Sequence, residues 1–262
     1  MDGLEQLIPW FDEALNAPAL VPDIRQRKPD ITPLQAYRLQ AGIMAARVAR
    51  GDRIAGYKAA LTSAAMRAQI GVPEPLLGTL LASKVFPEDE PVSLCGKGFL
   101  RATLEPEIAV VLGAELQGPG VDAVQALSAS AGYLPAIELG DYRAADAVGH
   151  TLIGSVVCNT FNGGIVLGRP LTPPAGIDLR VEGMSLRVNG VPAGSGTGIE
   201  VLGDPLNSVA FMANKLAELG LGLRAGMVLM TGSIIASIAV APGDHAEVAF
   251  TRLGTVQVRI AD

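Results

Sequence analysis

Histidine and cysteine, which supply most zinc ligands in proteins, are scarce in this sequence. It contains two of each among 262 residues: His150, His245, Cys95 and Cys158. A zinc site of nitrogen and sulfur ligands is therefore not expected. Two cysteines that are far apart in the sequence also provide no disulfide framework, so a reducing cytoplasm is the expected location.

Positive charge is also limited, and the net charge is −6. No cluster of lysine and arginine interrupts this acidic balance, which argues against a nucleic-acid partner. The first residues are acidic and lack the basic and apolar regions of a signal peptide. No uninterrupted apolar run reaches transmembrane length, so we expect no membrane association.

Only 18% of the residues are charged, whereas 49% are hydrophobic. This composition is apolar for a soluble monomer, and it favours subunit interfaces that bury part of the surface. We therefore expect a homo-oligomer.

The pattern divides the chain into a helical front segment, residues 1–75, and a β-rich domain, residues 76–262, which form one functional unit. Apolar residues at helical spacing predict a first helix over residues 4–15. Thr32-Pro33 opens a second helix, which runs to about Gly51. Residues 54–62 predict a short strand that contains Lys58. From residue 76 onward, short strands and Gly/Pro turns are typical of a β-sandwich or barrel-like roll.

Four segments of the second domain carry specific predictions. Residues 121–132 predict a helix, and residues 155–167 have the apolar, glycine-rich pattern of a strand. The Asn189-Gly190 pair predicts a hairpin. Asp204 and Pro205 predict the cap and first position of a helix that ends near Gly220.

The stretch Gly194-Ser195-Gly196-Thr197-Gly198 invites comparison with a nucleotide-binding loop. It follows the predicted hairpin instead of a parallel strand, the next helix begins too late, and no Gly-Lys-Ser/Thr sequence is present. Dinucleotide and P-loop binding are therefore not expected. The alternative that the backbone amides of this stretch bind a small carboxylate stays open.

Glu105 and Glu107 lie two residues apart at the start of an apolar, β-branched segment that ends at Leu112. On an extended chain, their side chains share one face. Because the two carboxylates repel each other and resist burial, this face is either open to water or holds a cation. Glu138 ends another short apolar segment. Three carboxylates on neighbouring strands would form an oxygen-only site suited to Mg²⁺ or Mn²⁺.

Several short motifs follow one another along the chain: Gly56-Tyr57-Lys58, Leu61-Thr62, Glu105-Pro106-Glu107-Ile108-Ala109, Ala136-Ile137-Glu138 with Arg143, Gly194-Ser195-Gly196, Val201-Leu202-Gly203-Asp204-Pro205-Leu206-Asn207, Leu223-Arg224-Ala225-Gly226 and Met230-Thr231-Gly232. Each is a weak match by itself. Together, in this order and spacing, they resemble the hydratase/decarboxylase branch of the fumarylacetoacetate hydrolase superfamily over nearly the whole chain.

The resemblance implies an α+β fold, a mixed β-sandwich roll of the fumarylacetoacetate hydrolase type with a helical N-terminal segment. It implies that Glu105, Glu107 and Glu138 hold Mg²⁺ or Mn²⁺. The metal would chelate the 1-carboxylate and 2-oxygen of a 2-oxo or 2-hydroxydienoic acid of the meta-cleavage type. Lys58 would transfer protons, with a pKa lowered by burial. Homo-oligomers, and a complex with a related pathway enzyme, are the implied protein partners.

The implied activity is that of a carbon–oxygen lyase, a hydratase similar to 2-keto-4-pentenoate hydratase. A decarboxylase similar to 4-oxalocrotonate decarboxylase is nearly as well supported. An acylpyruvate hydrolase comes third, because no His-Glu pair is evident in the N-terminal half. A family member that has kept the fold and lost the chemistry is the fourth interpretation.

By the same resemblance, five positions would contact the substrate: Leu76, Arg143, Asn159, Ser195 and Gly196. Two departures from the family bear on the reaction. Leu76 stands where the hydratases carry an acid and the decarboxylases carry an apolar residue. Cys158 and Phe161 replace the acid and the serine of the family's Asp-Asn-Ala-Ser stretch, of which only Asn159 remains.

Overall fold

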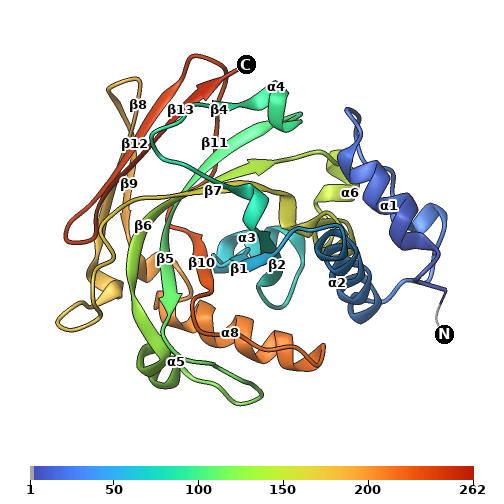
Figure 1. The fold of residues 1–262 in the computed structure, drawn as a ribbon, viewed down its shortest axis with the longest axis horizontal. Coiled ribbons are helices and arrows are strands. Elements are labelled where there is room, and N and C mark those ends of the chain that lie inside the picture. The colour runs from blue at the N-terminus through green and yellow to red at the C-terminus, as the bar shows by residue number, and fades with distance from the viewer. Residues whose placement is uncertain (1–2) are drawn as a thin grey trace.

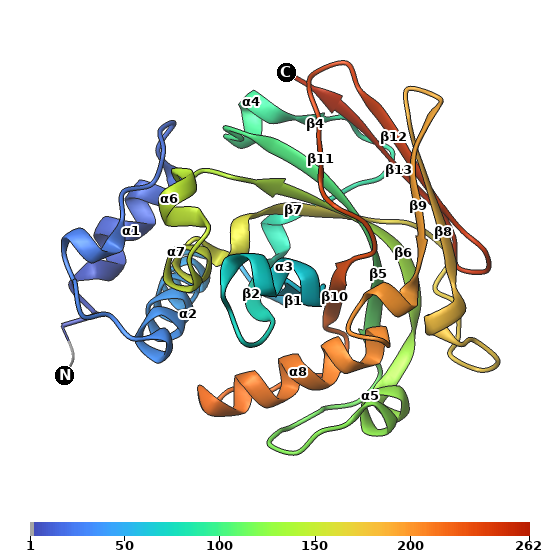
Figure 2. The same cartoon turned by 180° about the vertical axis from the view of Figure 1, so that it is seen from behind.

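The structure, a computed structural model, describes residues 3–262. At one end of the molecule, α1 (Leu7–Asn16) packs against α2 (Pro33–Ala49), as Figures 1 and 2 show. Thr32 caps α2 through a reciprocal capping box, as predicted. The carboxylate of Asp12 in α1 accepts a hydrogen bond of 2.7 Å from Arg47 of α2. An ion pair thus joins the two helices in addition to their apolar contacts.

An eight-stranded sheet forms the centre of the molecule in the order β2-β1-β10-β5-β6-β7-β3, with β11 paired to β5. Its strands are β1 (Ile54–Ala60), β2 (Leu76–Leu81), β3 (Val85–Phe86), β5 (Ala102–Leu112), β6 (Ser130–Asp141), β7 (Asn162–Leu167), β10 (Val228–Ser233) and β11 (Ile238–Ala239). The sheet curls until β2 contacts β7 (Figure 1). It thereby encloses one apolar cluster from five strands: Leu80, Ala109, Ala136, Ile165 and Met230.

The strand register determines which polar side chains face this interior. Directly opposed residues on paired strands lie on the same face. Lys58 is opposite Met230, and Met230 is opposite Ala109, so Lys58 faces the interior with them. Glu105 precedes Ala109 by four residues on β5 and is opposite Glu138 on β6. The curled sheet therefore collects these acids and the lysine on its inner face.

A second sheet packs on the outside of the first, through contacts of β12 and β13 with β6. Its order is β4-β13-β12-β8-β9, and its strands are β4 (Val92–Ser93), β8 (Gly183–Val188), β9 (Val191–Thr197), β12 (His245–Phe250) and β13 (Gly254–Ala261). Asn189 and Gly190 form the predicted turn between β8 and β9, and both have positive φ.

The remaining α-helices are α3 (Ala64–Ile70), α4 (Leu94–Lys97), α5 (Ala123–Ala129), α6 (Asp146–Gly149), α7 (Leu152–Val157) and α8 (Pro205–Glu218). The longest, α8, contacts β1 and β10 from outside the curled sheet. Asp204 caps it by accepting a hydrogen bond of 2.9 Å from the Leu206 amide, as predicted. Among residues 3–262, no helix has both the length and the apolar character needed to span a membrane.

The prediction of a strand over residues 155–167 is wrong for its first half. Thr151 caps α7 by accepting a hydrogen bond from the Gly154 amide, and the β-type segment begins only at Asn162. Val156 and Val157 are β-branched but buried, at 0% and 1% exposure, where α7 packs on α2. Tertiary burial outweighs their modest preference for strands.

The predicted helix over residues 121–132 is shorter in the structure. It ends at Ala129, because β6 begins at Ser130 and pairs with β5. The predicted division of the chain at residue 75 stays a prediction. The central sheet contains β1 from before this position as well as β2 from after it.

Candidate metal centre and active site

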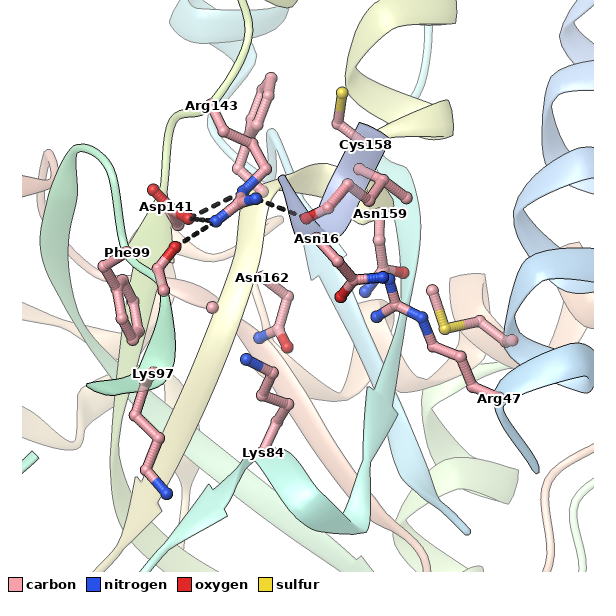
Figure 3. A pocket seen from close by; sticks show the side chains of 15 residues that line it. Asn16, Arg47, Lys84, Lys97, Phe99, Asp141, Arg143, Cys158, Asn159 and Asn162 are labelled. Carbon is pink, nitrogen blue, oxygen red and sulfur yellow. Dashed lines mark hydrogen bonds and ion pairs between the residues drawn. The ribbon is translucent and has the colours of Figure 1, made fainter. Parts of the chain in front are cut away.

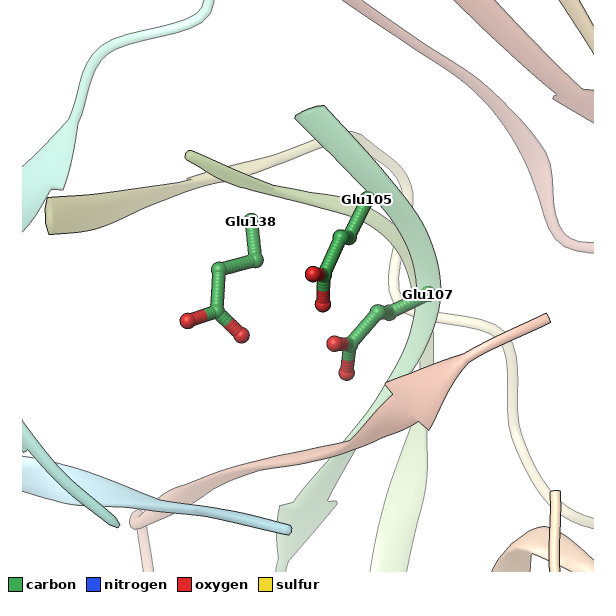
Figure 4. Close-up of side chains that lie close together, drawn as sticks. All are labelled: Glu105, Glu107 and Glu138. Carbon is green, nitrogen blue, oxygen red and sulfur yellow. The ribbon is translucent and has the colours of Figure 1, made fainter. Parts of the chain in front are cut away.

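Three glutamates converge inside the curled sheet. Glu105 and Glu107 come from β5, and Glu138 comes from β6 directly opposite Glu105. One carboxylate oxygen from each lies within 4.8 Å of the others, and Figure 4 shows the three carboxylates gathered on the same side of β5 and β6. Glu107 and Glu138 are 0% and 1% exposed, whereas Glu105 retains partial access to solvent. Glu105 therefore marks the open side of the cluster.

Each buried carboxylate has one oxygen that is held and one that is free. Glu107 Oε2 accepts a hydrogen bond of 2.7 Å from the Gly232 amide. Glu138 Oε1 accepts one of 2.8 Å from Lys58 and one of 3.0 Å from Asn162. Glu107 Oε1 and Glu138 Oε2 have no hydrogen-bond partner among the residues described. Because a buried oxygen without a partner is costly, these two atoms fit the ligands of a hard divalent cation.

The electrostatics of the cluster lead to the same conclusion. Burial raises the pKa of Glu105 to about 7, with Lys58 opposing the shift and Glu138 adding to it. Burial and the charge of Glu138 also raise the pKa of Glu107 well above its usual range. Three ionised carboxylates exceed the single positive charge of Lys58, so a divalent cation would balance them.

Lys58 lies in the middle of β1 and is 3% exposed. Its amine donates to Glu138 and, at 3.4 Å, to the carbonyl of Thr160. Gly78 is directly opposite on β2, where a Cβ atom would lie 2.9 Å from Lys58 Cγ. Glycine therefore leaves room for the lysine stem. Leu76 is the next residue of β2 on that face and is 1% exposed.

The expectation of a lowered lysine pKa is wrong for the described side chains by themselves. Burial would lower the pKa of Lys58, but the carboxylates of Glu138, Glu105 and Glu107 outweigh it and raise that pKa above its usual value. The lysine is therefore a protonated partner of the glutamates until their charge is compensated.

The segment before β7 forms an unusual turn beside Lys58. Asn159, Thr160 and Phe161 have φ values of 52°, 49° and 61°, all in the left-handed region. The Asn159 side chain accepts from the Thr79 amide at 2.7 Å and donates to the Thr79 carbonyl at 2.9 Å. The turn is thus tied to β2, and the Thr160 carbonyl is directed at Lys58. Backbone strain of this kind is often retained at functional sites.

The structure does not bring every predicted substrate contact to the glutamates. Arg143 pairs with Asp141 and lines another cavity (Figure 3). The Asn159 side chain is hydrogen-bonded to Thr79 of β2. Ser195 and Gly196 lie on β9 of the second sheet, where Gly196 packs against Ile234. No hydrogen bond links Ser195 or Gly196 to Lys58 or the glutamates in the described part of the chain. Their roles stay predictions.

Two residues of the site were not predicted as site residues. Asn162 donates to Glu138, and its polar side chain at the start of a β-branched strand was the available indication. Gly232 donates its amide to Glu107 with φ at 114°, a conformation that favours glycine. A Cβ atom there would lie 2.5 Å from Thr62, so the bulge in β10 requires this residue.

Comparison with known proteins agrees with this geometry. Residues 53–261 match the family model described as fumarylacetoacetate (FAA) hydrolase C-terminal. The chain is 36% identical over 258 residues to a 4-oxalocrotonate decarboxylase of Pseudomonas putida, covering 97% of each. It is 32% identical over 253 residues to a 2-hydroxyhexa-2,4-dienoate hydratase of Comamonas testosteroni, covering 95% of this chain and 94% of that protein.

A solved structure also matches nearly the whole molecule. It is that of 4-oxalocrotonate decarboxylase from Pseudomonas putida G7, complexed with magnesium and adipate. The TM-score is 0.93 at 33% identity, covering 98% of this chain and 97% of the other. The predicted α+β roll and the resemblance to hydratases and decarboxylases are confirmed. The chain therefore belongs to the fumarylacetoacetate hydrolase family.

Proposed function

We propose that the protein is a divalent-metal-dependent lyase for 2-oxo or 2-hydroxydienoic acids of the meta-cleavage type, acting as a hydratase similar to 2-keto-4-pentenoate hydratase. The observation that carries this proposal is the pair of buried carboxylates, Glu107 and Glu138, each with one free oxygen beside Lys58. The named activities of the relatives, and the magnesium and adipate of the solved structure, support it.

Glu105, Glu107 and Glu138 would hold Mg²⁺ or Mn²⁺. A bound ion supplies Lewis-acid stabilisation of negative charge on the substrate's 2-oxygen. The Gly232 amide orients Glu107, and Lys58 and Asn162 orient Glu138. Two of the three carboxylates are therefore held in place by the protein itself, which limits the cost of ordering them.

Lys58 is the proposed proton-transfer group. Glu138 and the Thr160 carbonyl each accept a hydrogen bond from its amine. In its ammonium form the group has three N–H bonds, so one remains for a substrate bound beside Glu138. We propose that Lys58, in the neutral amine form that becomes accessible once the charge of the glutamates is compensated, takes a proton from the enol oxygen, and that the ammonium group so formed returns this proton to carbon. The apolar wall around its stem excludes water from this exchange.

Decarboxylation of a compound like 4-oxalocrotonate is the second candidate, and Leu76 is the observation that favours it. This side chain is buried on the same face of β2 as Gly78, which is opposite Lys58. It offers no group to orient a water molecule. An apolar wall there favours loss of CO₂ over addition of water.

We also propose that the protein works as a homo-oligomer in the cytoplasm on a small-molecule 2-oxo acid. Large apolar side chains are exposed on several elements, including Val124 at 70% and Val181 at 66%. Such residues support burial between subunits.

The test is an assay of 2-oxo acids with Mg²⁺ that separates water addition from CO₂ release. We expect turnover that requires the metal and that Lys58→Ala abolishes, whereas Lys28→Ala leaves turnover unchanged. Lys28 pairs with Asp30 and is a matched control. Leu76→Asp should raise hydration relative to decarboxylation. Full activity of Lys58→Ala on every accepted substrate would contradict the proton-transfer role.

A further inference from the structure

A second polar cavity, of about 100 Å³, lies between the N-terminal helices and the start of β7 (Figure 3). None of the three glutamates lines it. Its charged side chains come from α2, the segment before β3, α4 and the end of β6 with the residues that follow it: Arg47, Lys84, Lys97, Asp141 and Arg143. Three amide side chains, those of Asn16, Asn159 and Asn162, also line it. Four of the five charged side chains are cationic and one is acidic.

The single carboxylate of the cavity wall is already engaged. Asp141 Oδ2 accepts from Arg143 Nε at 2.8 Å, and Asp141 Oδ1 accepts from the backbone amides of Leu100 and Arg101. Arg47 is paired outside the cavity, with Asp12 at 2.7 Å. These contacts engage the two arginines, and among residues 3–262 they leave the two lysines without an ion-pair partner.

Lys84 carries the excess charge. Its amine forms no ion pair or hydrogen bond with any part of the chain that the structure describes. In Figure 3 it points into the cavity, as does the amide of Asn162. Burial and the charges of Arg47 and Arg143 lower the pKa of Lys84, with Asp141 opposing the shift.

The other polar groups of the wall do not supply the missing negative charge. Cys158 is buried there, and burial raises the pKa of its thiol to about 12, so it stays neutral. Lys97 lies at the exposed rim, with its amine 5.5 Å from the centre of the Phe86 ring. The cavity thus combines excess positive charge with free N–H donors.

We propose that this cavity binds a small oxyanion, a phosphate or a carboxylate group, with Lys84 as the principal contact. A water molecule occupies roughly 30 Å³ in the liquid, so the cavity has room for such a group. Charge-assisted hydrogen bonds from ammonium groups to oxyanions are strong in partly buried sites. The anion would offset the repulsion among Lys84, Arg47 and Arg143.

The site is one side chain away from the candidate metal centre. Asn162 lines the cavity, and its amide nitrogen donates to Glu138 at 3.0 Å. Arg143 and Arg47 also link the cavity to β6 and to the N-terminal helices. An anion bound here would therefore hold the helical segment against the sheet beside the metal centre.

The experiment is calorimetric titration of the full-length protein with inorganic phosphate, with and without Mg²⁺. We expect saturable binding that weakens as NaCl is added. Lys84→Met should weaken the binding by about tenfold, which is typical for loss of a charged hydrogen bond. Lys28→Met is the charge-matched control outside the cavity, and Glu107→Gln is the control at the metal centre. Both should bind phosphate as the wild type does.

Thermal denaturation separates an anion site from a purely structural lysine. Without phosphate, Lys84→Met should melt at a higher temperature than the wild type, because one of the repelling charges is gone. Added phosphate should raise the Tm of the wild type more than that of the variant at the same phosphate concentration. Equal affinity of both proteins for phosphate, or the absence of saturable binding, would overturn the proposal.

Kinetics identify the source of the oxyanion. If added phosphate leaves the KM of every 2-oxo acid unchanged, the cavity binds a free anion. If phosphate competes with a dicarboxylic 2-oxo acid but not with a monocarboxylic one, the cavity binds the far carboxylate of the substrate. This part of the experiment rests on the proposed function. The calorimetric arm needs no turnover, so the anion site and the proposed function can fail separately.

Discussion

Glu107 is fully buried in an apolar sheet, a position that acidic side chains rarely occupy without compensation. The Gly232 amide compensates one of its oxygens, and the other faces Glu105 and Glu138. We propose that a cation compensates the second oxygen, which has no hydrogen-bond partner among the residues described. In this proposal Glu107 is a metal ligand, and its buried charge destabilises the fold unless a cation balances it.

Replacing Glu107 by glutamine should remove most of the affinity for Mg²⁺. The amide keeps the shape of the side chain and an oxygen for Gly232, but it loses the negative charge. We expect at least a tenfold weaker Kd by calorimetry and a higher Tm for the metal-free protein, because repulsion from the other glutamates is reduced. Glu247→Gln, on the exposed face of β12, is the matched control. Unchanged metal affinity would contradict the ligand role.

Glu105 makes the stability of the metal-free protein depend on pH in an uncommon direction. Burial raises its pKa from 4.5 to about 7. Between these values the folded chain holds more protons than the unfolded chain, so the free energy of unfolding decreases as pH rises. We expect the Tm of the metal-free protein to fall across this window, and saturating Mg²⁺ to remove most of the fall. A Tm that rises with pH without metal would be inconsistent with this cluster.

At the scale of elements, the left-handed turn over residues 159–161 connects the end of α7 to the site. Asparagine tolerates this conformation better than most residues, and its side chain here replaces a backbone partner for Thr79. The turn thereby fixes the Thr160 carbonyl beside Lys58. A loop residue thus positions the lysine without belonging to its strand.

Asn159→Ala should reduce both stability and turnover. It leaves two buried backbone groups of Thr79 without partners, at a cost of about 3 kcal/mol in the free energy of unfolding. The Thr160 carbonyl would lose its fixed position, so we expect a larger change in kcat than in KM.

Asn189→Ala is the control, because Asn189 also has positive φ and two side-chain hydrogen bonds, but on an exposed hairpin. Chemical denaturation should show a smaller loss for this variant. An equal decrease in the free energy of unfolding for both variants would show that burial does not add to the contribution of Asn159.

At the scale of the whole molecule, the N-terminal helices are attached to the sheet through polar contacts. Gln40 of α2 donates to the carbonyls of Leu77 and Val156, at 3.1 and 2.7 Å. Arg143, next to the end of β6, donates to the carbonyl of Leu15 in α1. The cationic cavity lies at this junction, so its occupancy should affect how firmly the two parts are held together.

Sedimentation should show a species larger than the 27.0 kDa chain at micromolar concentration. Exposed apolar side chains on α5 and the second sheet, such as Val124 and Val191, supply the surface that subunits would bury. A single species of chain mass under these conditions would contradict the predicted homo-oligomer.

The sequence alone was sufficient to predict features that depend on only a few neighbouring residues. Thr32-Pro33 and Asp204-Pro205 start helices, and Asn189-Gly190 forms a hairpin, because caps and turn conformations depend on the residues themselves. The period of a strand likewise placed Glu105 and Glu107 on one face. The glutamate pair could therefore be predicted, together with a third acid on a neighbouring segment.

Tertiary structure decided what depends on partners far away along the chain. The register of β5 and β6 set Glu138 opposite Glu105, and the curl of the sheet brought Lys58 and Asn162 to the same carboxylate. The three carboxylates that folding brings close to Lys58 raise its pKa, whereas burial alone would lower it. Burial against α2 stabilises the helical conformation of Val156 and Val157. Such outcomes follow from packing and from charges brought close by folding, which local propensities do not contain.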